Sequence, residues 1–562
     1  MEDFMQYLII AALILAFLTL KGIYDKKKAK EQILQQLKKA WGSIPTETYL
    51  PEKFRSLQSY YEKVKKETTD VDAITWNDLA MDEIYMRMNH TVSAVGEEYL
   101  YAMLHQLSFD EAELLERERL ISFFQNNEVA RNTVQEALYG VGKHQKIALY
   151  EYMSRMKDVK RESNLLHYIC AGGMAVSLAL CFLMPQIGVA LMFGFVFFNL
   201  YRYMKRKQEI EPYYRVMISV IRLLNSCEVL ENAKIEEIKS YTEQLSQMQK
   251  HFASFKKGFR LIASVKPTGD LADMILDYVR MLFHVDLIKF NSMLATFDAY
   301  EKELECIYTV IGFLDSMLAV ASFRTSCSNY SIPTLVKTDK PCLKLKEVCH
   351  PLIERPVPNS IQTDKAVLLT GSNASGKSTF LKTVAINAIL SQTVHTAIAA
   401  EYEASYFRVA SSMALQDNIL TKESYYIVEI KSLKRILDSI TDDIPMLVFV
   451  DEVLRGTNTV ERIAASSQVL SSLAKKNTLC FAATHDIELT HMLEDCYENY
   501  HFEEQVTDGI VTFDYKLHDG RAMSRNAIRL LGMIGYPKEI IAKAEDAARQ
   551  FVETGEWLKV QA

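Results

Sequence analysis

Between Ser163 and Tyr201 the chain runs for 39 residues without Asp, Glu, Lys or Arg, and only Pro185-Gln186 interrupts it near the middle. Helices that are apolar over such a length belong either in the hydrocarbon of a membrane or in the core of a large protein. The flanking segments KDVKR and RYMKRK are basic, which is typical of cytoplasmic loops. We therefore predict a transmembrane hairpin over residues 163–201 that turns at Pro185-Gln186 on the far face. A pair of buried core helices is the alternative.

The N-terminal segment holds another candidate span. Phe4 to Leu20 are 17 uncharged residues, which make about 25 Å of helix and are sufficient to cross a bilayer. Glu2 and Asp3 precede this run and the basic segment DKKKAK follows it, whereas a cleaved signal peptide carries its positive charges first. We expect an uncleaved anchor. The protein would then be a multi-pass protein of the cell membrane with three spans, its N-terminus outside and its long polar segments in the cytoplasm.

The length of 562 residues is several times that of a usual domain, so several domains are expected. The net charge of -7 gives no general attraction to nucleic acid, and the nine cysteines contain no C-x-x-C pair, which favours a reducing compartment. We divide the chain into a transmembrane anchor (1–20), a basic linker with helical core (21–162), the transmembrane hairpin (163–201), a further helical core (202–328), an α/β domain (329–548) and a C-terminal tail (549–562).

The α/β domain is predicted from a change of pattern after Cys327. Residues 208–325 carry apolar residues at helical spacing, whereas short apolar runs such as AVLLT, MLVFVD and TLCFAA follow it and alternate with helical segments. Strands that alternate with helices form a mostly parallel sheet covered by helices. The expected fold class is therefore multidomain, with an α-helical transmembrane and core region followed by an α/β domain.

The segment GSNASGKST at residues 371–379 fits the phosphate-binding pattern G-x-x-x-x-G-K-[ST], with a strand before it and a helix after it. Glycines let the backbone N–H groups surround phosphate oxygens at a helix N-terminus. We predict that Lys377 reaches the phosphates and that Ser378 binds Mg²⁺. The candidate nucleotide-binding residues of this loop are Gly371, Ser372, Asn373, Ala374, Ser375, Gly376, Lys377, Ser378 and Thr379.

Two acids end the strand MLVFVDE, 73 residues after Ser378. The carboxyl ends of parallel strands are where such sheets bind their ligands. Asp451 is therefore expected in the Mg²⁺ shell, and Glu452 is expected to orient or deprotonate an attacking water. The strand LCFAATH ends in the same way at His485, which we expect to contact the terminal phosphate or the water. A structural histidine is the alternative.

Taken in order, these segments resemble the ATPase domain of the MutS family, a P-loop domain of MutS/ABC type. The resemblance rests on GSNASGKSTFLK, QDNILTKESYYIVEI, DEVLRGTNTVER, ATHDIELT and the C-terminal DGRAMSRNAIRLLGMIGYPKEIIAKA. It implies an ATPase that uses ATP and Mg²⁺ and works as a dimer. It also implies that Ser424 completes the nucleotide site of the opposite subunit and that Tyr515 stacks on the adenine. NHTVSAVGEEYLYAMLHQL and IGFLDSMLAVASF resemble the family's helical core more faintly.

The sequence also departs from this family. It contains no mismatch-reading domain, a hydrophobic hairpin interrupts the helical core, and Lys422-Glu423 stand before Ser424 where the family usually has a glycine. We therefore expect a membrane-anchored dimeric ATPase that clamps and releases a cytoplasmic partner, which is DNA by family resemblance only. Two alternatives remain open, a transporter-type ATPase and a nucleotide-gated membrane scaffold that does not act on nucleic acid.

Overall fold

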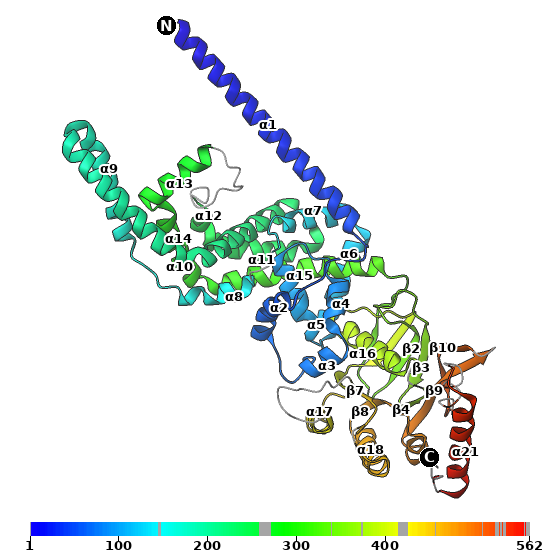
Figure 1. Cartoon of the computed structure of the whole chain (residues 1–562). Coiled ribbons are helices and arrows are strands. Elements are labelled where there is room, and N and C mark those ends of the chain that lie inside the picture. The colour runs from blue at the N-terminus through cyan, green and yellow to red at the C-terminus, as the bar shows by residue number, and fades with distance from the viewer. Residues whose placement is uncertain are drawn as a thin grey trace. The chain divides into compact units, whose positions relative to one another are not determined.

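The computed structural model describes residues 2–143, 148–257, 271–338, 340–372, 375–413, 425–455, 457–507, 510–522 and 535–555, with residues 528, 531 and 557. The chain forms two compact units (Figure 1). The first, here called the helical unit, contains residues 1–64, 88–102 and 119–326. The second, here called the α/β unit, contains residues 65–87, 103–118 and 327–562.

Helices predominate among the described residues up to 326, and over residues 208–325 the periodicity of the sequence predicts them. They are α1 (Glu2–Ala40), α2 (Pro51–Val64), α3 (Ala73–Asp78), α4 (Met81–Met88), α5 (Ala94–His105), α6 (Glu111–Asn126), α7 (Glu128–Tyr139), α8 (Leu149–Ser154), α9 (Asn164–Leu183), α10 (Pro185–Ala233), α11 (Lys239–Gln249), α12 (Ala253–Lys256), α13 (Leu271–Phe283), α14 (Val285–Ala299) and α15 (Glu301–Ser326), with short 3-10 turns at Arg155–Asp158, Glu236–Ile238 and Lys250–Phe252. The segment KPTGD at residues 266–270, whose composition is typical of a turn, lies outside the described residues.

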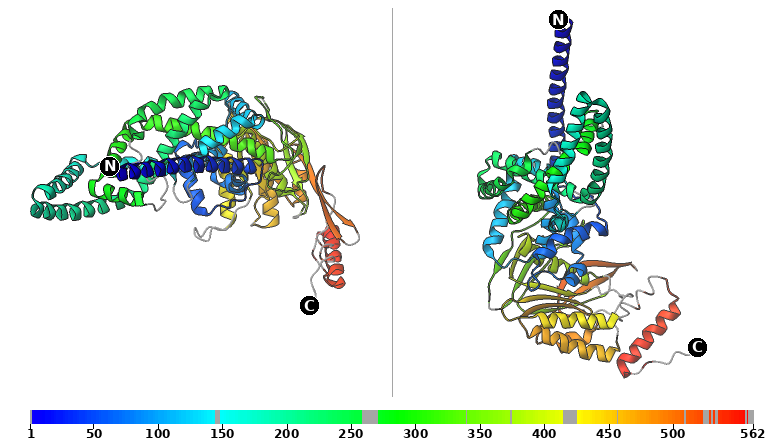
Figure 2. Two further views of the ribbon diagram at one scale, coloured as in Figure 1. Left: turned by 90° about the horizontal axis from the view of Figure 1, so that it is seen from above. Right: turned by 90° about the vertical axis from the view of Figure 1, so that its left-hand side faces the viewer.

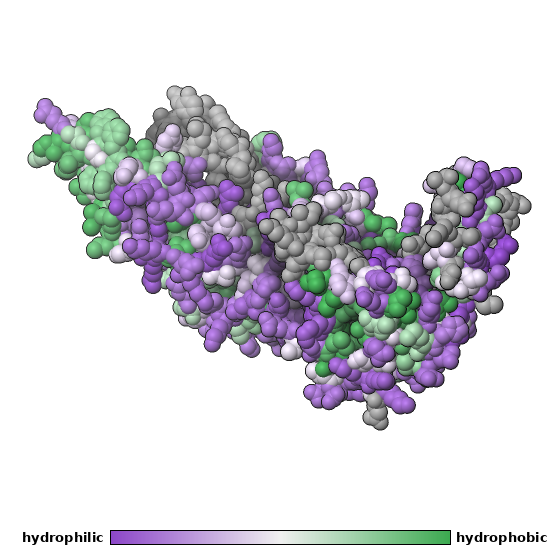
Figure 3. All heavy atoms as spheres, turned by 60° about the horizontal axis from the view of Figure 1, so that its bottom comes forward, coloured by the Kyte–Doolittle hydropathy of each residue, from purple (hydrophilic) through white to green (hydrophobic). Residues whose placement is uncertain are grey.

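Helices α9 and α10 meet at Met184 and lie side by side as a hairpin (Figure 2). Among the described helices α9, α10 and α15 are long and apolar enough to cross a membrane, by length and composition alone. They differ in burial, because 83% of the apolar window of α15 is buried within the protein but only 22% and 17% of those of α9 and α10. Hydrophobic residues accordingly cover the projecting hairpin at the upper left of Figure 3.

The exposed apolar surface of the hairpin includes large side chains along its length, among them Leu165, Ile169, Val176, Phe182, Ile187, Phe193 and Phe197. Phe182 is 90% exposed, an extreme value for a phenylalanine of a folded protein. The first predicted anchor forms the start of α1, which continues without a break to Ala40. The side chains of residues 2–16 in α1 lie outside the described ones.

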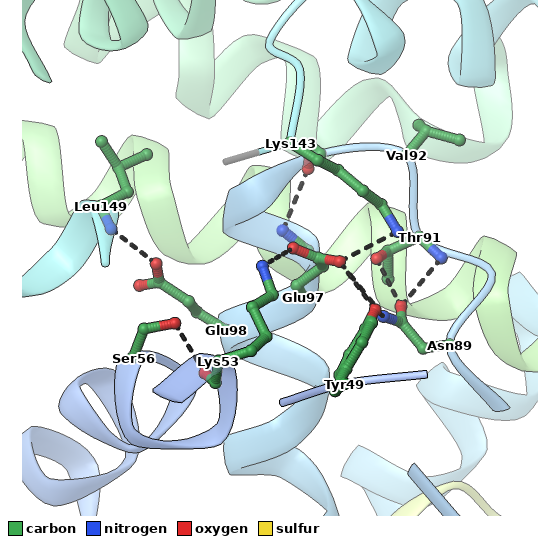
Figure 4. A network of polar contacts seen from close by, with 12 residues as sticks. Tyr49, Lys53, Ser56, Asn89, Thr91, Val92, Glu97, Glu98, Lys143 and Leu149 are labelled. Carbon is green, nitrogen blue, oxygen red and sulfur yellow. Dashed lines mark hydrogen bonds and ion pairs between the residues drawn. The ribbon is translucent and has the colours of Figure 1, made fainter. Parts of the chain in front are cut away.

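A buried carboxylate holds together the segments that pack around α5. Glu97 is 1% exposed, and Figure 4 shows the polar groups that surround it. Its carboxylate lies 2.7 Å from Nζ of Lys53 and 3.0 Å from Nζ of Lys143, and it accepts hydrogen bonds from Tyr49 and Asn89. Burial alone would raise the pKa of Glu97, but the two lysines outweigh it and lower the pKa. The buried charge is thus paired, as such charges must be.

A second buried carboxylate joins α15 to the start of α5. Asp315 accepts hydrogen bonds from the backbone N–H groups of Val92 and Ser93, at 3.1 and 2.9 Å, and from the Ser93 hydroxyl at 2.5 Å. Burial raises the pKa of Asp315 to about 6, against the influence of these donors. Gly96 faces this carboxylate so closely that a Cβ atom would overlap Oδ2 of Asp315. Glycine is therefore required at position 96.

The α/β unit contains two sheets. Its strands are β1 (Thr334–Val336), β2 (Leu343–Val348), β3 (Asn359–Thr363), β4 (Ala366–Thr370), β5 (Glu401–Ser405), β6 (Arg408–Ser412), β7 (Met446–Asp451), β8 (Thr478–Ala483), β9 (Tyr497–Thr507) and β10 (Ile510–Asp519). A sheet of six strands has the order β10-β9-β4-β8-β7-β6, and all pairs are parallel except β9 with β10. A smaller sheet has the order β1-β5-β2-β3.

Helices complete this unit, and they are α16 (Lys377–Thr393), α17 (Tyr425–Ser439), α18 (Thr459–Ala474), α19 (Ile487–Met492) and α21 (Lys538–Thr554). Every residue of β4 and β8 is buried, as expected of central parallel strands with both faces covered. The helical region followed by a mixed α/β domain is thus confirmed. Strands β4, β7 and β8 are neighbours, so the segments that follow their carboxyl ends meet at one edge of the sheet.

Part of the upstream chain folds with the α/β unit. Helix α3 packs against β6, the edge strand of the larger sheet. The Thr75 hydroxyl accepts the N–H of Ser411 at 3.0 Å, and Asp78 accepts the Ser411 hydroxyl at 2.7 Å and the N–H of Met413 at 2.9 Å. The edge of β6 is thus satisfied by α3, which removes an open strand edge.

Candidate nucleotide site

The loop from β4 to α16 has the backbone that its glycines permit. Gly371 and Gly376 adopt φ values of 136° and 107°, a region that side chains rarely enter. A Cβ atom on Gly371 would lie 2.7 Å from the carbonyl oxygen of Phe502. The Ser375 hydroxyl donates to the carbonyl of Ser372 at 2.8 Å and closes the loop. Asn373 and Ala374, which the sequence also assigns to this loop, lie outside the described residues.

Lys377 begins α16, as the motif predicts, and turns back over the loop. Its ammonium donates to the carbonyl oxygens of Gly371 and Ser372 at 2.7 and 2.8 Å, and the residue is 4% exposed. Burial lowers the pKa of Lys377 to about 8, although Asp451 and Glu452 oppose that change. Among the described residues, the hydrogen bonds of this buried cation go to two neutral carbonyls, and it is suited to receive an anion in this loop.

Asp451 and Ser378 lie together, as predicted for a Mg²⁺ site. Asp451 ends β7 and interacts with the Ser378 side chain. Burial raises the pKa of Asp451, and the hydrogen bond with Ser378 opposes the rise. Oδ1 of Asp451 is buried and has no hydrogen-bond partner among the residues that the structure describes. One hydroxyl and one carboxylate with a free oxygen fit Mg²⁺, which keeps most of its ligands as water and phosphate oxygens.

Glu452 lies beside them in a left-handed backbone conformation, with φ of 57°. Its N–H donates to the carbonyl of Ala483 at 2.9 Å, which ties the turn after β7 to the end of β8. Oε1 of its carboxylate lies 2.6 Å from Nε2 of His485, and Oε2 forms an ion pair with Arg455. Burial raises the pKa of Glu452, but His485 and Arg455 outweigh it, so the pKa is lowered and the carboxylate is charged.

The histidine is positioned by the residues around it. Thr484 donates its N–H to the carbonyl of Leu369 in β4 at 2.9 Å. Asp486 makes a bidentate pair with Arg462 of α18, at 2.6 and 2.9 Å. These contacts fix both neighbours of His485, whose imidazole remains partly exposed toward the site. The neighbouring contacts thus direct the imidazole at Glu452.

A cavity of about 240 Å³ opens beside the start of α16. Tyr515 lines it together with Thr379, Phe502 and His350, and its ring also lies against Gly376, where a Cβ atom would be 3.3 Å from Cδ1 of the tyrosine. Burial lowers the pKa of His350 to about 4, so its imidazole is neutral. This partly aromatic cavity, whose lining also includes Arg355, lies next to the phosphate loop and suits the base and sugar of a nucleotide.

The structure thus brings together Gly371, Ser372, Ser375, Gly376, Lys377, Ser378, Thr379, Asp451, Glu452, His485 and Tyr515. Ser424 lies outside the described residues, so its predicted contact with a second subunit stays a prediction. Sequence reasoning missed the roles of Arg455, Arg462 and Phe502. The two arginines stand inside the segment DEVLRGTNTVER that was singled out, but only the fold reveals which acid each one pairs with.

Comparison with known proteins gives a consistent result for this part of the chain. Residues 367–552 match the family profile of MutS domain V. MutS protein homolog 4 of Mus musculus is 29% identical over 296 residues, which are 48% of this chain and 30% of that protein. DNA mismatch repair protein MutS is 30% identical over 276 residues in Petrotoga mobilis, with 46% and 33% covered, and 31% identical over 212 residues in Thermus aquaticus, with 36% and 25% covered.

The chain spans about a third or less of the length of these curated relatives. The matched region contains the loop after β4, the acids after β7 and the histidine after β8. The C-terminal half of the chain is thus the part that matches the MutS family.

Proposed function

We propose that the protein is a membrane-anchored, dimeric ATPase that uses ATP binding and hydrolysis to clamp and release a cytoplasmic partner. The observation that carries the proposal is the meeting of Lys377, Asp451 and the Glu452–His485 pair at one edge of the sheet. Hydrolysis of a nucleoside triphosphate requires a loop that binds the phosphates, a carboxylate that binds the metal ion and a general base. Lys377, Asp451 and Glu452 would supply these three parts.

Each side chain has a distinct task in this proposal. The Lys377 ammonium exchanges its two carbonyl partners for phosphate oxygens and neutralises their charge. Ser378 and Asp451 would hold Mg²⁺, which supplies further positive charge next to the phosphates. Glu452 accepts a proton from the attacking water, and His485 holds the Glu452 carboxylate in place. The cavity beside Tyr515 would hold the base and select for a nucleotide.

Anchoring in the membrane is proposed from the surface of the hairpin. The apolar windows of α9 and α10 are mostly exposed, with only 22% and 17% buried, and water is an unfavourable surrounding for so large an apolar area. A lipid environment removes this cost, and the basic segments at both ends of the hairpin suit a cytoplasmic headgroup layer. With the start of α1 the hairpin would give three spans and place the ATPase domain in the cytoplasm.

Dimerisation and the partner are proposed from relatives. Two of the matched proteins carry DNA mismatch repair in their names, which makes duplex DNA the first partner to test. The net charge of -7 does not itself favour DNA, so binding would have to depend on a local basic surface. A nucleotide-gated scaffold that holds a protein at the membrane is the second candidate.

The test is ATP hydrolysis by the full chain in detergent, with and without duplex DNA at low salt. Glu452→Gln should reduce the rate by at least about a hundredfold while ATP binding is retained, and Glu539→Gln, which changes an exposed ion pair of α21, should leave it unchanged. Hydrolysis at the wild-type rate by Glu452→Gln would refute the catalytic assignment. If DNA neither binds nor changes the rate, the partner is not DNA and the scaffold function is favoured.

A further inference from the structure

A second acid reaches the turn that carries Glu452. Glu429 of α17 is 3% exposed, and its carboxylate accepts the backbone N–H of Leu454. Burial raises the pKa of Glu429, and the N–H groups of Leu454 and Arg455 oppose the rise. A buried carboxylate that contacts backbone rather than substrate has no task in the hydrolysis described above. Its contact lies two residues from the expected general base.

The turn has a backbone conformation that needs outside support. Glu452 and Leu454 both have positive φ values, 57° and 59°, which are strained for residues other than glycine. Such conformations persist only where the surroundings hold them. Three contacts do so, namely the bond from Glu452 to Ala483, the bond from Ser466 to the carbonyl of Val453 at 3.2 Å and the bond from Leu454 to Glu429.

Helix α17, which carries Glu429, also contacts the start of α3. Arg435 of α17 donates to the carbonyl of Ser411 at 2.6 Å and forms an ion pair with Asp72, the residue that caps α3. Ser411 in turn bonds to Thr75 and Asp78, as described for the edge of β6. Helix α17 therefore holds the turn after β7 through Glu429 and the start of α3 through Arg435.

We propose that Glu429 is a positioning residue for ATP hydrolysis, which acts through its hydrogen bond with the Leu454 N–H. In this proposal α17 couples that hydrogen bond to the position of α3. The inference rests on the proposed ATPase function and names a regulatory input to the same site. Because a helix of 15 residues moves as a rigid rod, a shift of α3 moves Glu429 and with it the turn that aims the Glu452 carboxylate. Coupling through a packed element of this kind requires direct measurement.

The first measurement separates kcat from KM for ATP in the full chain. Glu429→Ala should lower kcat by about tenfold or more and leave KM for ATP nearly unchanged, because the side chain contacts neither phosphate loop nor cavity. Glu429→Gln should retain part of the rate, since its amide oxygen can still accept the Leu454 N–H. The matched control is Asp438→Asn on the same helix, an exposed partner of Lys434, which should behave as wild type. An unchanged kcat in Glu429→Ala would overturn the proposal.

A double-mutant cycle tests the link to α3. If α17 transmits position, Glu429→Gln and Arg435→Gln act on one element, and their combined effect on kcat should differ from the product of the single effects by threefold or more. A combined effect equal to that product would overturn the coupling. Amide hydrogen exchange supplies a readout without activity. Peptides that cover residues 451–459 should exchange faster in Glu429→Ala than in Asp438→Asn, and equal exchange would overturn the positioning role.

Failure of the ATPase proposal is distinguishable from failure of this inference. Wild-type protein that does not hydrolyse ATP refutes the proposed function, while the exchange comparison still decides whether Glu429 holds the turn. Conversely, a wild-type rate that falls in Glu452→Gln but not in Glu429→Ala upholds the function and refutes the inference.

Discussion

Nε2 of His485 lies 2.6 Å from Oε1 of Glu452, and Arg455 pairs with the other oxygen of the same carboxylate. The two partners lower the pKa of Glu452 against the effect of burial. The proposed general base is therefore charged at neutral pH, and each of its oxygens already has one partner. A water bound by Glu452 must use the remaining lone pairs of these oxygens.

The value of kcat/KM for ATP should fall on the acidic side of its pH profile as Glu452 becomes protonated, and the position of this fall should depend on the pairing of Glu452 with Arg455. Replacing Arg455 by Met removes one cation, so the pKa of Glu452 rises and the fall in kcat/KM moves to higher pH, by about one unit. The measurement is kcat/KM for ATP between pH 4.5 and 8 in both proteins. If the acidic side of the kcat/KM profile does not move in Arg455→Met, a group other than Glu452 titrates in this pH range.

Binding of the triphosphate should depend on pH through Lys377. Its pKa is lowered to about 8, so the free protein loses this charge as the pH rises through 8, whereas a bound phosphate restores it. Affinity should fall by up to tenfold per pH unit above 8, with proton uptake on binding, which calorimetry in two buffers can measure. In Lys377→Met the affinity should be weak and its dependence on pH in this range should disappear.

Arg462 and Asp486 should act as a unit on His485. Removing either partner releases the loop that aims the imidazole at Glu452, so Arg462→Ala and Asp486→Ala should each lower kcat by about tenfold. The double variant should be no slower than the slower single variant, because the bidentate pair is already lost. Rates that simply multiply would show that the residues act separately.

Position 96 should tolerate no side chain. A Cβ atom there overlaps Oδ2 of Asp315, and the buried carboxylate cannot retreat without breaking its bonds to Ser93. Gly96→Ala should lose about 2 kcal/mol or more of stability. Gly172→Ala, where no atom lies within 4 Å of the new Cβ, is the matched control for thermal unfolding in detergent. Equal melting temperatures would contradict the close approach.

The orientation of the hairpin can be tested at its turn. In a cysteine-free background, Gln186→Cys should react with a membrane-impermeant maleimide added to intact cells, because the turn is expected outside. Lys234→Cys, beyond the end of α10, should react only after the cells are opened. Labelling of both positions from the same side would refute a membrane hairpin.

The sequence predicts the loop after β4 and the helix that follows it because the signals for them are local. The loop after β4 and the start of α16 at Lys377 follow from the spacing of two glycines and one lysine. The six-stranded sheet was only partly predictable, since β9 (YENYHFEEQVT) is rich in acids and resembles no buried strand. Its place is set by pairing with β4, which is distant in the sequence, and with β10, which follows it directly.

Contacts over long sequence distances could not be predicted. Nothing near Asp78 indicates that it bonds to Ser411, 333 residues away, and nothing in SYYIVEI shows that Glu429 reaches Leu454. Composition alone also fails to separate α15 from α10, because both are apolar enough for a membrane. Burial separates them, since α15 carries acids such as Asp315 that find donors inside the protein.

Helix α10 continues for 49 residues from the tip of the hairpin to Ala233 and passes through Pro212 without ending. An α-helix of this length measures about 74 Å. Its first part is the exposed apolar arm and its last part is buried among the helices of the same unit. The membrane attachment that we propose is therefore a continuous helix and not a flexible linker. Within this unit, tilting the arm in the lipid would turn the packed helices as well.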